Sequence, residues 1–322
     1  MFRVNSPILN ESPTMTPKIG PPLATHQAFG LHWSFPFPFP FFSPTHTEIS
    51  TDVIVELGPV PPISEDAKRT TEWTFASLDA VHIDLPDVAK VFVSNGNRVI
   101  VERYDNSAQE SLLLLLMGGV ASIILNQRGF FPLHGSGIAT TRGAVIFVGN
   151  SGAGKSTTLG SFLQQGYKMI CDDLAAIRLD GNGVAWLYPG VPLYKLCPDS
   201  AEALEVQTSG LPQVSTEMSK FIVSAMDHQV DNPLPVHAVY AISTHSDSEY
   251  IIERQSGSDK FHTLLDNTMG KFSFRSMGLH TNHFHSAISI ANSIRIGSIR
   301  RPKNGKIDSR QLVKQIEADF HA

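Results

Sequence analysis

Alternating apolar and polar positions dominate the first third of the chain and predict β-strands there. The alternating runs lie at residues 53–57, 80–85, 91–94 and 99–103. Asn95-Gly96-Asn97 separates the last two runs, and an Asn-Gly step in that position is typical of a hairpin turn. We therefore expect a β-rich N-terminal domain over residues 29–107.

The segment before these strands has a different composition. Residues 1–28 are rich in Pro, Ser and Thr, which predicts a disordered or weakly docked tail without a signal peptide. Phe and Pro then alternate over residues 35–42, where the prolines remove backbone donors and favour an extended chain. We expect an apolar strap across the N-terminal domain here, with a proline-motif ligand for a partner protein as the alternative.

The most apolar run in the chain covers residues 112–125. It is shorter than a membrane span and is interrupted by Gly118 and Gly119, so it predicts a buried helix and no membrane association. We expect this helix to run from about 108 to 127, with a cap within residues 105–107 and an end before Gly129. It would open a second domain over residues 108–322.

Beyond this helix, short apolar strands alternate with helical patterns, which predicts an α/β domain. Gly166 is the expected C-terminal stop of the first of its helices. The strands are expected at 135–139, 144–148, 168–171, 174–179, 184–187, 238–242 and 250–253, and the helices at 154–165 and 309–318.

Composition excludes several classes of protein. The 322 residues carry a net charge of −5, which is unlike a protein that binds nucleic acid through its phosphates. Cys171 and Cys197 are the two cysteines, and neither lies in a CxxC motif or a Cys/His cluster. This predicts neither disulfides nor a zinc site, and it fits the reducing cytoplasm.

Candidate chemistry begins with a phosphate-binding loop between a predicted strand and a predicted helix. Glycines allow its N–H groups to converge on phosphate oxygens, the lysine places a positive charge at the β- and γ-phosphates, and the serine can bind Mg²⁺. We therefore expect ATP and Mg²⁺ to bind here, within an α/β P-loop kinase-type sheet with flanking helices. The expected nucleotide-binding residues are Gly149, Asn150, Ser151, Gly152, Ala153, Gly154, Lys155, Ser156 and Thr157.

Two acidic residues follow the next predicted strand. Asp172 and Asp173 end the strand at 168–171, and adjacent strand residues point to opposite sides, so we expect different tasks for the two carboxylates. One would bind Mg²⁺ and the other would accept the proton of an incoming hydroxyl. His134, just before the strand pair that leads into the loop, is either a partner of these groups or a hydrogen-bonded core histidine.

These motifs together resemble the catalytic domain of HPr kinase/phosphorylase, over roughly residues 120–180. The resemblance is carried by Leu133-His134-Gly135, the phosphate loop, Gln165-Gly166-Tyr167 and Asp172-Asp173. It implies phosphoryl transfer from ATP to a protein serine. Lys155 would contact phosphate, Ser156 and Asp172 would serve the metal, Asp173 would be the general base, and His134 would be its catalytic neighbour.

The chain also departs from that family, because the Glu-Arg-Gly segment that follows the hairpin there is replaced here by residues 188–196. Asn126-Gln127-Arg128-Gly129 and the pattern Pro192-x-x-Lys195-Leu196 look more like an HPr-kinase-related branch associated with lasso-peptide biosynthesis. That resemblance implies phosphorylation of a serine at the C-terminus of a precursor peptide.

Several alternatives stay open at this point: an HPr-type kinase/phosphorylase, a small-molecule kinase and a regulatory nucleotide-binding module. Arg300-Arg301-Pro302-Lys303 is either a phosphate clamp or a solvated basic turn. Lys195 and Lys220 are possible contacts for a C-terminal carboxylate, or plain surface lysines. We expect a peptide or small-protein acceptor as partner, and a homo-oligomer is possible.

Overall fold

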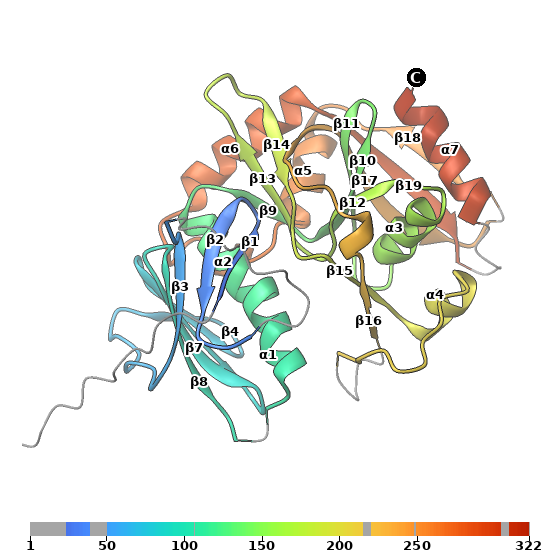
Figure 1. Cartoon of the computed structure of the whole chain (residues 1–322). Coiled ribbons are helices and arrows are strands. Elements are labelled where there is room, and N and C mark those ends of the chain that lie inside the picture. The colour runs from blue at the N-terminus through green and yellow to red at the C-terminus, as the bar shows by residue number, and fades with distance from the viewer. Residues whose placement is uncertain are drawn as a thin grey trace, which may run out of the picture.

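The structure is a computed structural model that describes residues 24–38, 50–105, 107–214, 220–247, 249–303 and 309–321. Most of the expected N-terminal tail and residues 39–42 of the Phe-Pro segment lie outside these ranges. Residues 24–28, assigned to the tail from composition, form a strand in the structure. The described residues build two large sheets, each covered by helices (Figure 1).

The first sheet has eight strands in the order β1-β2-β3-β8-β7-β6-β5-β4. Val91, Val93, Val99 and Val101 point inward from the predicted hairpin and are fully or almost fully buried. The β-rich N-terminal region is therefore confirmed. Its strands are β1 (Ala24–Ala28), β2 (Leu31–Phe35), β3 (Val53–Leu57), β4 (Lys68–Thr71), β5 (Thr74–Ala76), β6 (Ala80–Leu85), β7 (Ala89–Ser94) and β8 (Arg98–Arg103).

The apolar helix follows this sheet as three continuous segments, α1 (Gln109–Leu115), a π-helical turn η1 (Leu116–Val120) and α2 (Ala121–Gln127). Over Gln109–Gln127 it is long and apolar enough to cross a membrane, but 67 % of its most apolar 18-residue stretch is buried inside the protein. Its apolar side chains share one hydrophobic core with the first sheet, as expected for a buried helix. The prediction of a cap within residues 105–107 is wrong, because the N-cap residue is Ala108 and no side chain forms a capping hydrogen bond there.

The second sheet has nine strands, and its central order is β12-β10-β11-β17-β14-β13-β9, with β19 beside β17 and β18 beside β19. A separate two-stranded sheet joins β15 (Leu193–Leu196) to β16 (Phe221–Ser224). The nine strands are β9 (Phe131–Leu133), β10 (Gly135–Thr140), β11 (Gly143–Val148), β12 (Lys168–Cys171), β13 (Ala175–Leu179), β14 (Ala185–Tyr188), β17 (Leu234–His245), β18 (Ile251–Arg254) and β19 (Arg295–Pro302).

Strand β11 is buried on both faces because helices cover both sides of the second sheet (Figure 1). Val145 and Phe147 face the core that contains α3 and α7, whereas Ile146 and Val148 face the core that contains α5 and α6. A strand buried in this way reads as a continuous apolar run. The helices are α3 (Lys155–Gln164), α4 (Pro198–Ala203), α5 (Ser258–Asp266), α6 (His280–Ser293) and α7 (Ser309–His321), with short 3₁₀ turns η2 (Met226–His228) and η3 (Lys271–Ser273).

The α/β architecture agrees with the sequence, but its connections are more mixed than a simple parallel sheet. Strand β10 lies between β11 and β12 and is antiparallel to both. The phosphate loop follows β11 and the acidic pair follows β12, so the two motifs come from strands that are not neighbours. The carboxyl ends of β11 and β12 still point the same way. The two motifs therefore meet across β10.

A half-buried histidine in α6 predicts acid sensitivity of the fold. The His283 ring stacks on Phe131 at 4.3 Å between centroids and also packs on Phe274. Burial lowers the pKa of His283 from 6.5 to about 4. The unfolded chain therefore binds this proton more readily, so the free energy of unfolding should fall as the pH drops from about 6.5 towards 4, by at most about 1.4 kcal/mol per pH unit.

Urea denaturation across that pH range measures the effect. The variant His283→Phe keeps a ring in the stack and should lose this part of the pH slope, whereas His285→Phe, at an exposed position of the same helix, should keep it. An identical slope in the protein and in His283→Phe would show that His283 is not the group responsible.

Candidate active site

The phosphate loop connects β11 to α3, as the motif predicts. Its glycines have backbone conformations that other residues rarely adopt, with φ values of 139° at Gly149, 81° at Gly152 and 104° at Gly154. A Cβ atom on Gly149 would lie 2.4 Å from the carbonyl oxygen of Ile242. Glycine is therefore required where the loop leaves the sheet.

Lys155 at the start of α3 is almost completely buried, with 7 % exposure. Its ammonium donates to the carbonyl oxygens of Gly149 (2.8 Å) and Asn150 (3.2 Å), which hold it over the loop. Burial lowers the pKa of Lys155, and the nearby carboxylates of Asp172 and Asp173 partly oppose that shift. The lysine thus lies over the loop, as the motif predicts.

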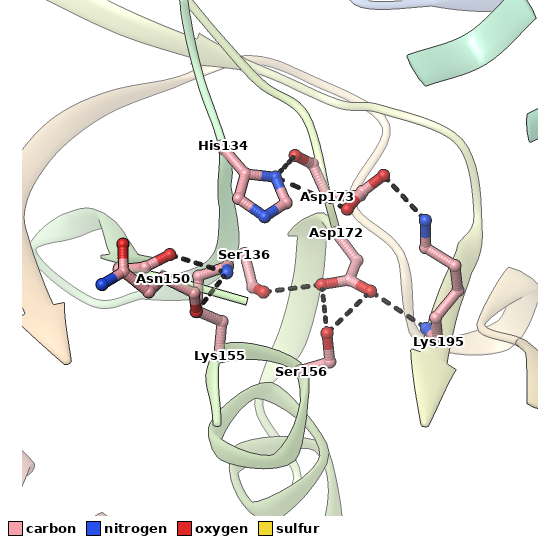
Figure 2. Close-up of polar contacts among 9 residues, drawn as sticks. His134, Ser136, Asn150, Lys155, Ser156, Asp172, Asp173 and Lys195 are labelled. Atoms are coloured by element: carbon pink, nitrogen blue, oxygen red, sulfur yellow. Dashed lines mark hydrogen bonds and ion pairs between the residues drawn. The ribbon is translucent and has the colours of Figure 1, made fainter. Parts of the chain in front are cut away.

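Asp172 joins the loop to two other strands (Figure 2). The Ser156 hydroxyl donates to both of its carboxylate oxygens, at 3.0 and 3.2 Å. The Ser136 hydroxyl of β10 donates to Oδ1 at 2.6 Å, and the Lys195 backbone N–H of β15 donates to Oδ2 at 3.0 Å. Hydrogen bonds from α3, β10 and β15 therefore fix the position of the Asp172 carboxylate.

Asp173 points away from Ser156, as the sequence predicted, but the reason is different. Strand β12 ends at Cys171, and Asp173 has a φ of 69°, with the Leu174 N–H donating to the Asp172 carbonyl at 2.8 Å. A three-residue turn, not strand alternation, thus separates the two carboxylates. A non-glycine residue in this conformation is strained, and such strain is concentrated at functional sites.

The Asp173 carboxylate forms an ion pair with Lys195, whose Nζ lies 2.7 Å from Oδ2. Burial would raise the pKa of Asp173, but Lys195, with smaller contributions from His134 and Lys220, lowers it below its usual range. Asp173 is therefore ionised at neutral pH. Its side chain keeps 31 % exposure, so the charge can still be reached from solvent.

His134, just before β10, contacts the turn that carries Asp173. Its Nδ1 lies 3.0 Å from the Asp173 carbonyl oxygen and 3.5 Å from Oδ1 of the same residue. Burial and the nearby Lys155 charge lower the pKa of His134, so the ring is neutral at pH 7. Because a carbonyl can only accept, Nδ1 carries the proton and Nε2 does not. His134 thus orients the turn of Asp173.

The donor atoms around Asp172 fit Mg²⁺. The Asp172 carboxylate lies within 3.2 Å of the hydroxyl oxygens of Ser136 and Ser156, and all three groups offer oxygen ligands. In the part of the chain that the structure describes, there is no group of three or more His, Cys, Asp or Glu residues that could hold a metal. Mg²⁺ is commonly bound by one or two carboxylates together with substrate phosphates, so Asp172 and Ser156 suit it.

The other residues of the loop region have more varied surroundings. Arg301 of β19 donates from Nε to the Ala153 carbonyl at 2.8 Å, so part of the basic segment near the C-terminus packs on the loop. Arg300 instead pairs with Glu253. The Thr157 hydroxyl forms a hydrogen bond with the Ser200 hydroxyl at 2.7 Å, so its side chain points away from the loop towards α4. Ser151 and Gly152 are exposed at the tip of the loop.

Sequence reasoning missed two parts of this site. Ser136 lies one position into β10, and its two-residue spacing from His134 was the available signal, because residues two apart on an extended chain share a face. Lys195 was expected to be either a carboxylate contact for an acceptor or a plain surface lysine, whereas the structure places it on Asp172 and Asp173.

No protein-family model matches the chain, and no curated protein matches it either. Among solved structures, the chain is similar to the Hpr(Ser) kinase/phosphatase from Coxiella burnetii, at 14 % sequence identity and a TM-score of 0.30. That match covers 59 % of this chain and 90 % of the other.

Proposed function

We propose that this protein is an ATP- and Mg²⁺-dependent kinase that phosphorylates a serine hydroxyl of a peptide or small protein. The observation that carries the proposal is the ionised Asp173 carboxylate, which stands beside the phosphate loop without contacting the loop serine. A protein that only binds nucleotide has no need of a second carboxylate there. A kinase needs one to accept the proton of the attacking hydroxyl.

Each residue has one role in this proposal. The loop N–H groups and Lys155 would hold the phosphates of ATP, while Ser156 and Asp172 would hold Mg²⁺. The metal, when bound, neutralises charge that develops on the β- and γ-phosphate oxygens. His134 orients the turn of Asp173 through its Nδ1 hydrogen bond.

The reaction balances with these groups alone. The serine Oγ of the acceptor forms a bond to the γ-phosphorus, and the bond from that phosphorus to the β,γ-bridging oxygen breaks. Asp173 takes the proton of the serine hydroxyl, and ADP leaves with the electron pair of the broken bond. Lys155 lies where it can stabilise the charge on the transferred group.

We further propose that the acceptor is the C-terminal serine of a lasso-peptide precursor. The support is the resemblance carried by residues 126–129 and 192–196. The second of these segments contains Lys195, which contacts both carboxylates of the site. A protein of this kind would act in the cytoplasm. An HPr-type protein kinase/phosphorylase, a small-molecule kinase and a regulatory nucleotide-binding module are the competing functions.

A transfer assay tests the proposal. The purified full chain is incubated with ATP, Mg²⁺ and serine peptides, including precursor peptides that end in serine, and the products are analysed by mass spectrometry. We expect the mass gain of one phosphate on serine, and none when EDTA is present. Phosphorylation of a sugar or nucleotide and of no peptide would contradict the peptide-kinase function. Nucleotide binding without any transfer would support the regulatory module.

A further inference from the structure

A small apolar pocket opens directly beside the proposed base. One wall is the helix α1–η1 and the other consists of Val191 and β15, and the carboxylates of Asp172 and Asp173 also line the pocket. The cavity measures about 40 Å³. Its lining residues are Leu113, Leu114, Met117, Gly118, Asp172, Asp173, Val191, Leu193 and Lys195.

The size and chemistry of this pocket exclude several occupants. Pockets that enclose small-molecule ligands have volumes of roughly 300–1,000 Å³, far above that of this cavity. A sugar or nucleoside acceptor would also need polar partners, whereas the walls away from the acidic pair consist of aliphatic and methionine side chains and a glycine. The pocket therefore suits the end of one aliphatic side chain.

The π-helical turn η1 shapes the wall nearest to Asp173. Gly118 in this turn is buried, and a Cβ atom there would lie 3.9 Å from Oδ2 of Asp173 and 3.9 Å from Cε of Met269. These are ordinary contact distances, so a methyl group at this position would fill the pocket without displacing its neighbours. Single π-helical turns inside α-helices are frequently found at functional sites.

The position of the pocket relative to Asp173 determines which residue of an acceptor peptide can place its side chain in the pocket. The acceptor serine must point its hydroxyl at the Asp173 carboxylate, which itself lines the pocket. In an extended peptide, side chains two residues apart share a face, whereas those of adjacent residues point to opposite sides. The side chain that enters the pocket would thus belong to a residue two positions from the serine.

Resting on the kinase function proposed above, we infer that the pocket lined by Leu113, Met117 and Leu193 is an acceptor subsite. It selects peptides with an aliphatic residue two positions from the phosphorylated serine. Burying or excluding a small aliphatic group in such a pocket changes specificity roughly tenfold to two-hundredfold.

Synthetic peptides test this inference. Each contains a single serine, with Leu, Ala or Asp placed two positions before or after it, and control peptides carry the same changes at the adjacent position. We expect kcat/KM to be about tenfold or more higher for Leu than for Asp at one of the two-position sites. The adjacent position should show little preference.

Gly118→Ala adds the structural control, because its methyl group would occupy the pocket. The variant should lose about tenfold in kcat/KM for the Leu peptide and little for the Ala peptide, with the KM for ATP unchanged. Gly119→Ala is the matched control, because its Cβ would contact only Leu115 of the same helix, at 3.9 Å. This control should keep the Leu preference. Thermal unfolding checks that both variants fold.

The possible outcomes separate this inference from the proposed function. If serine is phosphorylated with equal efficiency whatever residue lies two positions away, the subsite inference is wrong and the kinase function stands. Equal loss on the Leu and Ala peptides in Gly118→Ala would also contradict the subsite, since a filled pocket affects only the larger side chain. If no peptide is phosphorylated, the proposed function fails and the subsite fails with it.

Discussion

Asp173→Asn is expected to lower phosphoryl transfer about 10²- to 10⁴-fold while ATP affinity stays nearly unchanged. Asparagine cannot accept the serine proton, but it has the size of aspartate. It also tolerates positive φ, so the strained turn at φ 69° should persist. The Asp172 carboxylate keeps its hydrogen bonds to Ser156 and Ser136, which leaves the proposed metal position intact. The loss should therefore fall on the chemical step.

Single-turnover phosphorylation of a serine peptide and ATP binding by calorimetry separate the two quantities. Asp172→Asn is the matched control, because it changes the neighbouring carboxylate by the same one atom. This control should raise the Mg²⁺ concentration required for half-maximal activity, whereas Asp173→Asn should leave that concentration unchanged. An unaltered transfer rate in Asp173→Asn would remove the base assignment.

Lys155→Ala is expected to reduce both ATP affinity and turnover. A hydrogen bond to a charged group contributes about 1.5–3 kcal/mol, so affinity should fall roughly tenfold to a hundredfold. Loss of a preorganised charge at the transferred group costs about 10²–10³ in rate. The lysine is buried and its ammonium is held by Gly149 and Asn150, so its position is set before the nucleotide binds.

ATP titration and initial rates at saturating ATP measure the two losses. Lys168→Ala is the matched control, because Lys168 is an exposed lysine at the start of β12, away from the carboxylates at the other end of that strand. It should bind and turn over ATP as the unmodified protein does. If Lys155→Ala changed neither quantity, the loop at 149–156 would not be the active site.

Local patterns predicted much of this molecule. The hairpin around Asn95-Gly96-Asn97, the apolar helix and the strand–loop–helix at the phosphate loop all follow from a few adjacent residues. Other elements were predicted only in part or not at all: β17 extends over Leu234–His245, although only residues 238–242 were expected as a strand, and α5, α6 and β19 were not expected. Pro235 and His237 interrupt the apolar pattern of β17, so tertiary pairing with β11, β14 and β19 decides its length.

The sequence by itself determined the chemistry that this chain carries. It specified a loop with the phosphate-binding motif, including its lysine and serine, two adjacent carboxylates and a histidine, because residue type and short spacing alone define these groups. Tertiary structure alone decided which partners hold the two carboxylates apart. The turn at Asp173 aims one carboxylate at Lys195 and leaves the other on Ser156, and the π-helical turn brings an apolar wall beside them. These partners come from β15 and η1, far away in the chain, and only packing brings them together.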